Sequence, residues 1–164
     1  MDRTANLLGA VAIAMTDRIR QNLDATAKRS GEAAAALVVL GYAPGLSVEP
    51  LRQVLGLSHP GTVRLVDRLA DDGLVERRRA QDARAVSLHL TKKGTGLRKR
   101  LLKQRGGELE VALDGLSKEE RASLGVLLSK VLKNLPKSEM DKHNICRLCE
   151  VGACEQCPIP GNAV

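Results

Sequence analysis

Residues 57–91, LSHPGTVRLVDRLADDGLVERRRAQDARAVSLHLT, decide the fold of this chain. After Ser58, a residue type that often caps the start of a helix, apolar residues recur at helical spacing as far as Gly73. The spacing of the apolar residues then changes from that of a helix to that of a strand. Residues 74–78 read as a short strand, and residues 85–90 alternate apolar and polar side chains as a half-buried strand does. The stretch therefore predicts a helix followed by a β-hairpin with a polar tip.

Helices are predicted on both sides of this stretch. Three precede it, at residues 3–29, 32–40 and 47–55, and two follow it, at residues 91–115 and 117–135. Ser117 and Glu120 match a capping box for the last helix, and Pro136 ends it. We expect a mainly α domain of about six helices plus a β-hairpin over residues 1–135, with its core ending at about Leu135. Residues 136–164 are expected to form a polar, Cys-rich tail.

The composition excludes several classes of protein. The chain is 43% hydrophobic and 27% charged, as folded soluble proteins are, and Tyr42 is its only aromatic residue. This argues against a large β-sandwich and against a stacking surface for single-stranded nucleic acid. No apolar run is long enough to cross a membrane, and charged residues follow the short apolar run at 7–15 where a signal peptide has small ones. We expect a cytoplasmic protein that binds no membrane.

The positive charge is concentrated in one third of the chain. The formal net charge is +7, and residues 58–105 hold thirteen Lys or Arg against five Asp or Glu, whereas the other positions hold thirteen basic and fourteen acidic residues. A continuous basic segment is typical of a surface that binds a polyanion. A solvated basic face kept for solubility would have the same composition.

The helix after Ser58 has two different faces. Four of its residues are expected to face a core, namely Thr62, Leu65, Val66 and Leu69. Arg64 and Arg68 lie four residues apart on the opposite face, so both can reach one DNA major groove or its flanking phosphates. The guanidinium fork suits paired hydrogen bonds to guanine or phosphate. The alternative is a surface helix whose two arginines pair with Asp67 and Asp71.

This region resembles the MarR family of winged helix-turn-helix transcriptional regulators. Residues 57–69 and 72–77 resemble the recognition helix and first wing strand of that family, and Asp82-x-Arg84-x5-Leu90-Thr91 is similar to its wing signature. The likeness covers about residues 5–135. It implies a winged helix-turn-helix fold that dimerises through its N- and C-terminal helices. It also implies a repressor that binds pseudo-palindromic operators in double-stranded DNA until a ligand or an oxidant releases it.

The resemblance also assigns roles to individual residues. Those expected to line the major groove are Ser58, His59, Gly61 and Arg64. Those expected to meet phosphates are Arg77, Arg78 and Arg79, with one or two pairing with acidic neighbours instead. Arg84 is expected in the minor groove, supported by Asp82. Many relatives have an apolar residue and then Thr where this chain has Thr62 and Val63, so Val63 is expected to meet a thymine methyl group.

The tail holds all four cysteines within twelve positions, as Cys146-x2-Cys149-x4-Cys154-x2-Cys157. Two C-x2-C pairs suit tetrahedral zinc, with His143 as a substitute ligand, although the pairs are closer together than in most zinc fingers. The following Pro158 also occurs in iron–sulfur motifs, whose middle spacing differs. Reversible disulfides that sense oxidant, or a tail without function, are the other interpretations. Arg147 is expected to lower the pKa of the neighbouring thiols.

We expect no enzymatic activity. A thiol oxidoreductase would place its C-x2-C pair in a βαβ unit, and His59 and His89 lie in the predicted helix and hairpin rather than beside a nucleophile. The alternative function is that of a metal-binding or thiol-redox protein whose basic face serves a protein partner. The near absence of aromatic side chains gives no stacking site for a small aromatic effector, so the sequence identifies no effector.

Overall fold

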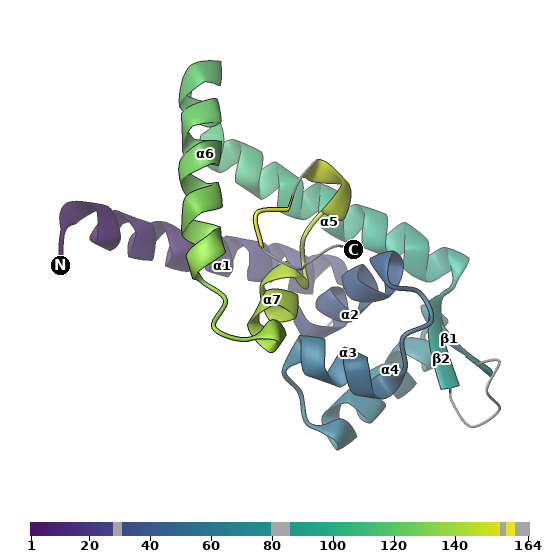
Figure 1. Ribbon diagram of the computed structural model, residues 1–164. Helices are drawn as coiled ribbons and strands as arrows, with labels where there is room; N and C mark the ends of the chain where they lie inside the picture. Colours follow the sequence, from purple (N-terminus) through teal and green to yellow (C-terminus); the bar gives the residue numbers. More distant parts are fainter. Residues whose placement is uncertain (28–30, 80–85, 155–156, 160–164) are drawn as a thin grey trace.

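The computed structural model describes residues 1–27, 31–79, 86–154 and 157–159 (Figure 1). Its elements in chain order are α1 (Arg3–Ala27), α2 (Gly31–Tyr42), α3 (Val48–Leu55), α4 (His59–Asp71), β1 (Val75–Arg79), β2 (Val86–Leu90), α5 (Lys92–Leu113), α6 (Lys118–Asn134), α7 (Glu139–Cys146) and a short 3₁₀ turn (Val151–Ala153). The predicted mainly helical fold with one hairpin is confirmed. The described part of the chain has one helix more than expected, α7, which lies in the tail.

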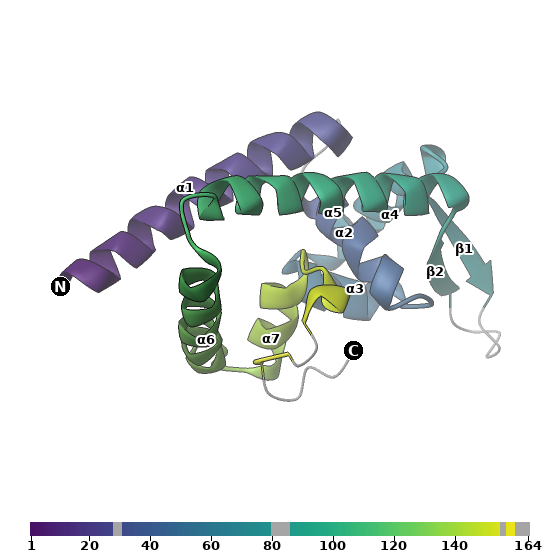
Figure 2. The same cartoon turned by 90° about the horizontal axis from the view of Figure 1, so that it is seen from above.

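Helix α2 lies at the centre of the core. Every residue from 33 to 40 is buried, and the helix is apolar on all sides, as expected for a helix that is packed all round. The long helices α1 and α5 pack against each other and against α2, while α3 and β2 also contact α2 (Figure 2). Leu51, Leu69, Leu88 and Leu101 complete the same core from four other elements.

A tight junction connects α4 to the hairpin. Gly73 has φ +67°, and its N–H and that of Leu74 donate to the carbonyl groups of Ala70 and Leu69 at 2.8 and 2.9 Å, which ends α4 in a Schellman motif. Thr91, which caps α5, donates from its hydroxyl to the Gly73 carbonyl at 2.7 Å and from its N–H to the Leu74 carbonyl at 3.1 Å. The end of α4, the start of β1 and the start of α5 are therefore joined.

The hairpin is anchored at its base. β1 and β2 pair antiparallel, with Val75 opposite Leu90 and Arg79 opposite Val86. Leu88, which is fully buried, also exchanges two 2.9 Å backbone hydrogen bonds with the loop before α3, through Gly45 and Leu46. The base of the wing is thus attached to the helix-turn-helix as well as to α5.

The tail is more than a polar extension. Ser138 caps α7 by accepting a hydrogen bond from the Asp141 N–H at 3.2 Å, and α7 packs against α3. Leu148 packs against the core, and Cys146 and Ile159 are buried. The expectation that the core ends at about Leu135 is therefore wrong. The spacing of Ser138 and Asp141 is a helix-start signal that the sequence does contain.

Two helices extend apolar side chains away from the body. α6 has no buried residue, and it leaves the body at the end of α5 (Figure 1). Its exposed apolar residues are Val126, Leu127, Leu128 and Val131. Leu7, Leu8, Val11 and Ile13 are exposed in the same way on the outer half of α1. None of the helices in the described ranges has the length and apolar character needed to cross a membrane.

The junction predicts opposite effects of two alanine substitutions in the first turns of α5. A Cβ at Gly94 would lie 2.0 Å from the Leu74 carbonyl oxygen, whereas a Cβ at Gly96 meets nothing within 4 Å. We expect Gly94→Ala to lower the free energy of unfolding by about 1–3 kcal/mol, because backbone must move. Gly96→Ala is expected to raise it by about 0.5–1 kcal/mol. Urea denaturation measures both, and equal stability of the two variants would contradict the tight junction.

Candidate nucleic-acid interface

Helix α4 presents the two faces that the sequence predicts. Its buried residues are Thr62, Leu65, Val66 and Leu69. Thr62 is fully buried and donates its hydroxyl to the Ser58 carbonyl at 3.1 Å, so its expected orientation toward the core is confirmed. Arg64 and Arg68 are exposed, and Val63 is half-buried. The apolar face packs this helix on the core and leaves the basic face to solvent.

The two arginines of α4 remain available to a ligand. Asp67, the acidic residue between them, accepts a hydrogen bond from Arg77 of β1 at 2.6 Å. Within the described ranges, neither Arg64 nor Arg68 forms an ion pair. The alternative in which these arginines pair with Asp67 and Asp71 is therefore absent from this structure.

The start of α4 is organised by Ser58 and Glu49. The Ser58 hydroxyl accepts a hydrogen bond from the Gly61 N–H at 3.2 Å, so it caps the helix while its own proton stays available. A Cβ at Gly61 would lie 3.0 Å from this hydroxyl oxygen. His59 Nδ1 lies 3.7 Å from a carboxylate oxygen of Glu49. Hydrogen bonds from Arg52, and to a smaller extent the nearby His59, lower the pKa of Glu49.

The arginines of the wing divide into two groups. Arg77 pairs with Asp67, and Arg78 pairs with Glu76, as expected for one or two of these residues. Arg79 is exposed and forms no ion pair with another described residue. Asp82 and Arg84, the predicted wing-tip residues, lie outside the described residues. The structure brings Arg77 to the recognition helix and leaves Arg79 to solvent at the end of β1.

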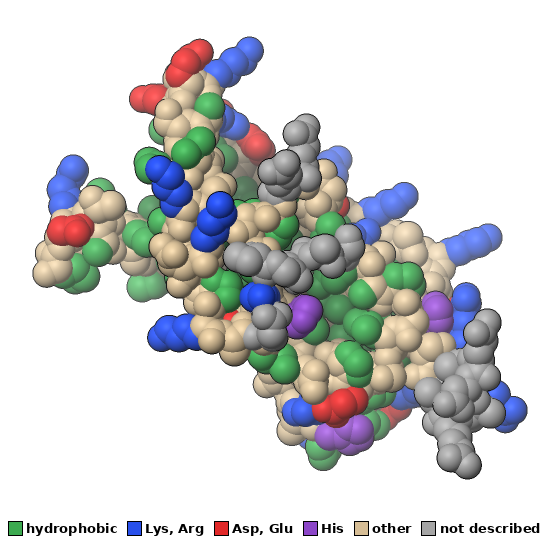
Figure 3. Space-filling view, in the orientation of Figure 1, with side chains coloured by type: hydrophobic (Ala, Val, Ile, Leu, Met, Phe, Trp, Pro, Cys, Tyr) green, Lys and Arg blue, Asp and Glu red, His purple; other side chains and the backbone are tan. Residues whose placement is uncertain are grey.

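The basic segment is not a single surface. Figure 3 shows Lys and Arg side chains along α5 as well as near the hairpin. Lys93 donates to the Asp72 carbonyl at 2.7 Å, and Arg98 extends over Gly41 toward the Val38 carbonyl at 3.4 Å. Arg105 lines a cavity together with residues of α1, α2, α3 and the tail. Part of the positive charge therefore serves packing, which charge counting along the sequence does not reveal.

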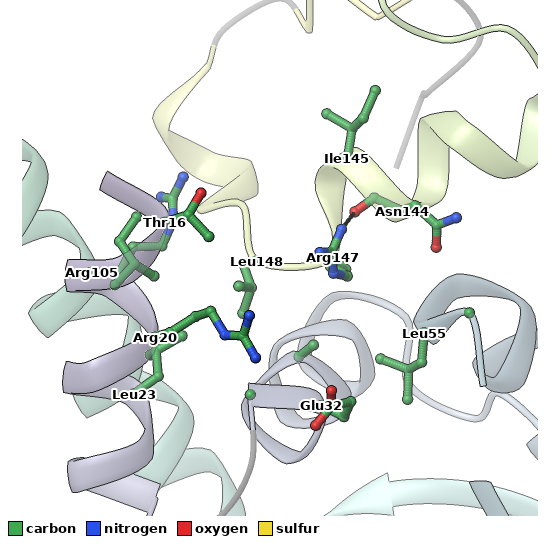
Figure 4. A pocket seen from close by; sticks show the side chains of 14 residues that line it. Thr16, Arg20, Leu23, Glu32, Leu55, Arg105, Asn144, Ile145, Arg147 and Leu148 are labelled. Atoms are coloured by element: carbon green, nitrogen blue, oxygen red, sulfur yellow. Dashed lines mark hydrogen bonds between the residues drawn. The ribbon is translucent and has the colours of Figure 1, made fainter. Parts of the chain in front are cut away.

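The sequence does not predict this cavity. It has a volume of about 580 Å³ and lies between α1, α2, α3 and the tail (Figure 4). Arg20, Arg105 and Arg147 line it together with Glu32, and Leu148 enters it from the tail. No sequence motif marks this site, because its residues come from five segments that only folding brings together.

The cysteines gather beside the cavity. All four are free thiols: Cys146 is buried, Cys149 is half-buried, and Cys154 and Cys157 are exposed. The Cys149 N–H donates to the Cys146 carbonyl at 2.9 Å, which closes a turn after α7. In the part of the chain that is described, no three His, Cys, Asp or Glu side chains already form a metal-binding group.

The charge environment of the thiols differs from the expected one. Burial raises the pKa of the Cys149 thiol, and the counteracting charge is Arg105 rather than Arg147. The Arg147 guanidinium instead donates to the Asn144 carbonyl. The expectation that Arg147 lowers the thiol pKa is thus wrong for Cys149. Burial first, and then Cys146 and Cys149, raise the pKa of Tyr42 to about 12, so the only aromatic ring lies beside these thiols.

A helix-turn-helix with an exposed basic second helix, followed by a basic hairpin, defines a winged helix-turn-helix protein. The sequence model of the MarR family matches residues 29–85. The HTH-type transcriptional regulator PetP of Rhodobacter capsulatus is 46% identical over 59 residues, which are 35% of this chain and 36% of PetP, so that match spans about a third of the relative's length. The transcriptional repressor MprA of Escherichia coli is 28% identical over 141 residues, 82% of this chain and 80% of MprA.

Solved structures agree with these matches. Streptococcus pneumoniae FabT in complex with DNA is 26% identical, with a TM-score of 0.68 over 81% of this chain and 95% of FabT. The reduced form of MarR from E. coli is 25% identical, with a TM-score of 0.66 over 83% of this chain and 98% of MarR. The chain is therefore similar to MarR-family regulators, most directly over residues 29–85, and it has their winged-helix fold.

The cap of α4 predicts a difference between two serine substitutions. Ser58 and Ser47 both stand at N-cap positions, but only Ser58 accepts a side-chain capping bond. We expect Ser58→Ala to lower the free energy of unfolding by about 1 kcal/mol, because the Gly61 N–H loses its partner. Ser47→Ala is the control and should change stability far less. Denaturation followed by circular dichroism measures both, and equal losses would contradict the assigned cap.

Proposed function

We propose that this protein is a cytoplasmic, homodimeric repressor that binds pseudo-palindromic operators in double-stranded DNA. The observation that carries the proposal is the pair of exposed arginines on α4, Arg64 and Arg68, which are free of ion pairs with described residues. The relatives support this direction, since MprA is named a transcriptional repressor and FabT was solved in complex with DNA. No catalytic role is proposed for any residue.

Helix α4 would read the bases. Arg64 lies on the exposed face of the N-terminal half of the helix, the half that reaches base edges when such a helix enters the major groove. The half-buried Val63 is proposed to meet a thymine methyl, and His59 and the free hydroxyl proton of Ser58 would contact bases or phosphates. Gly61 adds no side chain between the helix and the duplex. The Arg77–Asp67 bond would hold the wing against this helix.

The wing and its flanks would contact the DNA backbone. Arg79 is proposed as a phosphate contact, Arg68 as a phosphate or base contact, and Arg84 as the minor-groove contact supported by Asp82. Arg78 can exchange its exposed ion pair with Glu76 for a phosphate, since exposed pairs of this kind are weak. Each phosphate contact releases counterions, so the affinity should fall steeply with salt.

Substitution of the free arginines tests DNA binding. The probe is a duplex selected from a random library by the wild-type protein. We expect Arg64→Ala to lose about 1–3 kcal/mol of binding free energy on this duplex, because a base contact is lost. Arg79→Ala should weaken binding to all duplexes and reduce the salt slope by about 1. Fluorescence anisotropy over a range of salt concentrations measures both effects.

Lys103→Ala is the matched control for these variants, because it also removes one exposed positive charge. Lys103 lies on α5 about 15 Å along the helix from Lys93, which contacts the end of α4 at the Asp72 carbonyl. Its affinity should stay close to that of the wild type. An unchanged affinity for both arginine variants would instead favour the alternative function, a metal-binding or thiol-redox protein whose basic face binds a protein partner. If wild-type protein enriches no duplex, DNA binding itself is contradicted.

A second copy of the chain is proposed to cover the exposed apolar faces of α6 and outer α1. Leu127 and Val131 are 57% and 37% exposed, and a 17-residue helix without a buried residue gains little stability on its own. These faces lie away from α3, α4 and the hairpin (Figure 1), so a dimer through them leaves both recognition helices accessible. Two identical half-sites of a pseudo-palindrome need this arrangement.

Charge on the apolar face of α6 should separate the subunits. We expect the double substitution Leu127→Glu and Val131→Glu to lower the molar mass in solution from that of a dimer toward that of a monomer, because the buried interface would hold unpaired carboxylates. Ser129→Glu, on the polar side of the same helix, is the control and should stay dimeric. Analytical ultracentrifugation gives the mass. A charged variant that remains dimeric would contradict this interface.

A further inference from the structure

The four cysteines lie within one short stretch of the tail. Cys146 ends α7, Cys149 closes the turn after it through a 2.9 Å backbone hydrogen bond, and Cys154 follows the 3₁₀ turn at residues 151–153. The Cys149 thiol is hydrogen-bonded to Cys146 and lies within electrostatic range of Cys154 and Cys157. The chain has no other cysteine. Among the described residues no three of these thiols already lie close enough to hold an ion, but the twelve-residue segment that carries them is short enough to wrap around one.

The surroundings of these thiols link them to the rest of the domain. Residues 144–148, which run through Cys146 and the turn before Cys149, form the tail side of the 580 Å³ cavity (Figure 4). Helix α7 packs against α3, the first helix of the helix-turn-helix, and Leu148 packs against the core. Arg105 of α5 faces Cys149 and supplies positive charge beside the thiols.

We propose that Cys146, Cys149, Cys154 and Cys157 form a thiolate centre for a thiophilic metal, and that this centre clamps the tail against α3 and over the cavity. Two C-x2-C pairs supply four thiolates, the ligand set that zinc and iron–sulfur centres share. Cys146 and Cys149 are placed together in this structure, and metal binding would draw Cys154 and Cys157 onto them.

The charge balance of the centre agrees with its surroundings. When one divalent ion binds, each of the four thiols releases a proton to solvent, and the four thiolates leave the centre with a net charge of −2. Arg105 faces this charge, and Arg20 and Arg147 line the adjoining cavity. Because the thiols must lose protons, metal affinity should fall as the pH is lowered.

The only aromatic residue provides a direct probe of the site. Tyr42 lies close enough to Cys146 and Cys149 for their charges to act on its phenol group, and the chain has no Trp or Phe. Titration of reduced, metal-free full-length protein with Zn²⁺ should therefore change the tyrosine fluorescence, with an end point near about one ion per chain. Co²⁺ in place of Zn²⁺ should give the visible absorption of a tetrahedral thiolate complex.

Metal analysis of variants tests the ligand set. The double variant Cys154→Ser and Cys157→Ser changes two exposed residues, so it should fold as the wild type does and lose the metal. His143→Gln is the matched control and should keep the metal, because His143 is exposed and lies outside the four-cysteine set. Zinc, or iron with sulfide after anaerobic purification, would each support the thiolate centre. Absence of metal after both preparations would overturn it, as would metal retained by the double variant or lost from His143→Gln.

Amide hydrogen exchange tests the clamp separately from metal binding. Amide hydrogen exchange in residues 139–149 should slow when metal is added to wild-type protein, and it should not change in the double cysteine variant. Equal exchange rates with and without bound metal would contradict the clamp. Because α3 packs against both α7 and α4, the centre is placed to affect DNA binding. This regulation rests on the proposed function. Metal-loaded protein that binds no duplex would contradict that function and leave the metal result intact.

Discussion

The position of helix α4 depends on the hydrogen bonds that the hydroxyl and the N–H of Thr91 donate to the carbonyl groups of Gly73 and Leu74. They tie the end of α4 to the start of α5, the long helix that packs on α1 and α2. Gly94 allows this approach, because a side chain there would collide with the Leu74 carbonyl. The hydrogen bonds between Leu88 and the loop before α3 hold the hairpin from the other side. Helix α4 and the wing are therefore supported as one unit rather than as two flexible parts.

The basic residues of this unit differ in whether they already have a partner in the protein. Arg77 and Arg98 are engaged by groups of the protein, whereas Arg64, Arg68 and Arg79 have no ion pair with another described residue. A guanidinium that already bonds to a carboxylate must exchange that partner before it can bind a phosphate, while a free one is ready. The proposed DNA-binding surface is thus smaller than the basic third of the chain, and it is concentrated on α4 and β1.

The tail places the four cysteines on a segment that packs against the same unit. α7 packs on α3, and α3 packs on α4, so only one element separates the tail from the second helix of the helix-turn-helix. The cavity beside the cysteines is lined by the tail on one side and by α1 and α2 on the other. The only aromatic ring, Tyr42, lies at the end of α2 within electrostatic range of the Cys146 and Cys149 thiols.

The sequence by itself determined the local features. The core face of α4, the caps at Ser58, Thr91 and Ser117, and the strands of the hairpin follow from residues a few positions apart, and the structure has them where the pattern predicts. Only the tertiary structure decided which groups meet. Asp67 and Arg77 lie ten residues apart on two elements, Val38 and Arg98 lie sixty apart, and the tail folds back onto α3. A periodic pattern records which side of an element is apolar, but the partner of a charged or sulfur-containing side chain is selected by packing between distant segments.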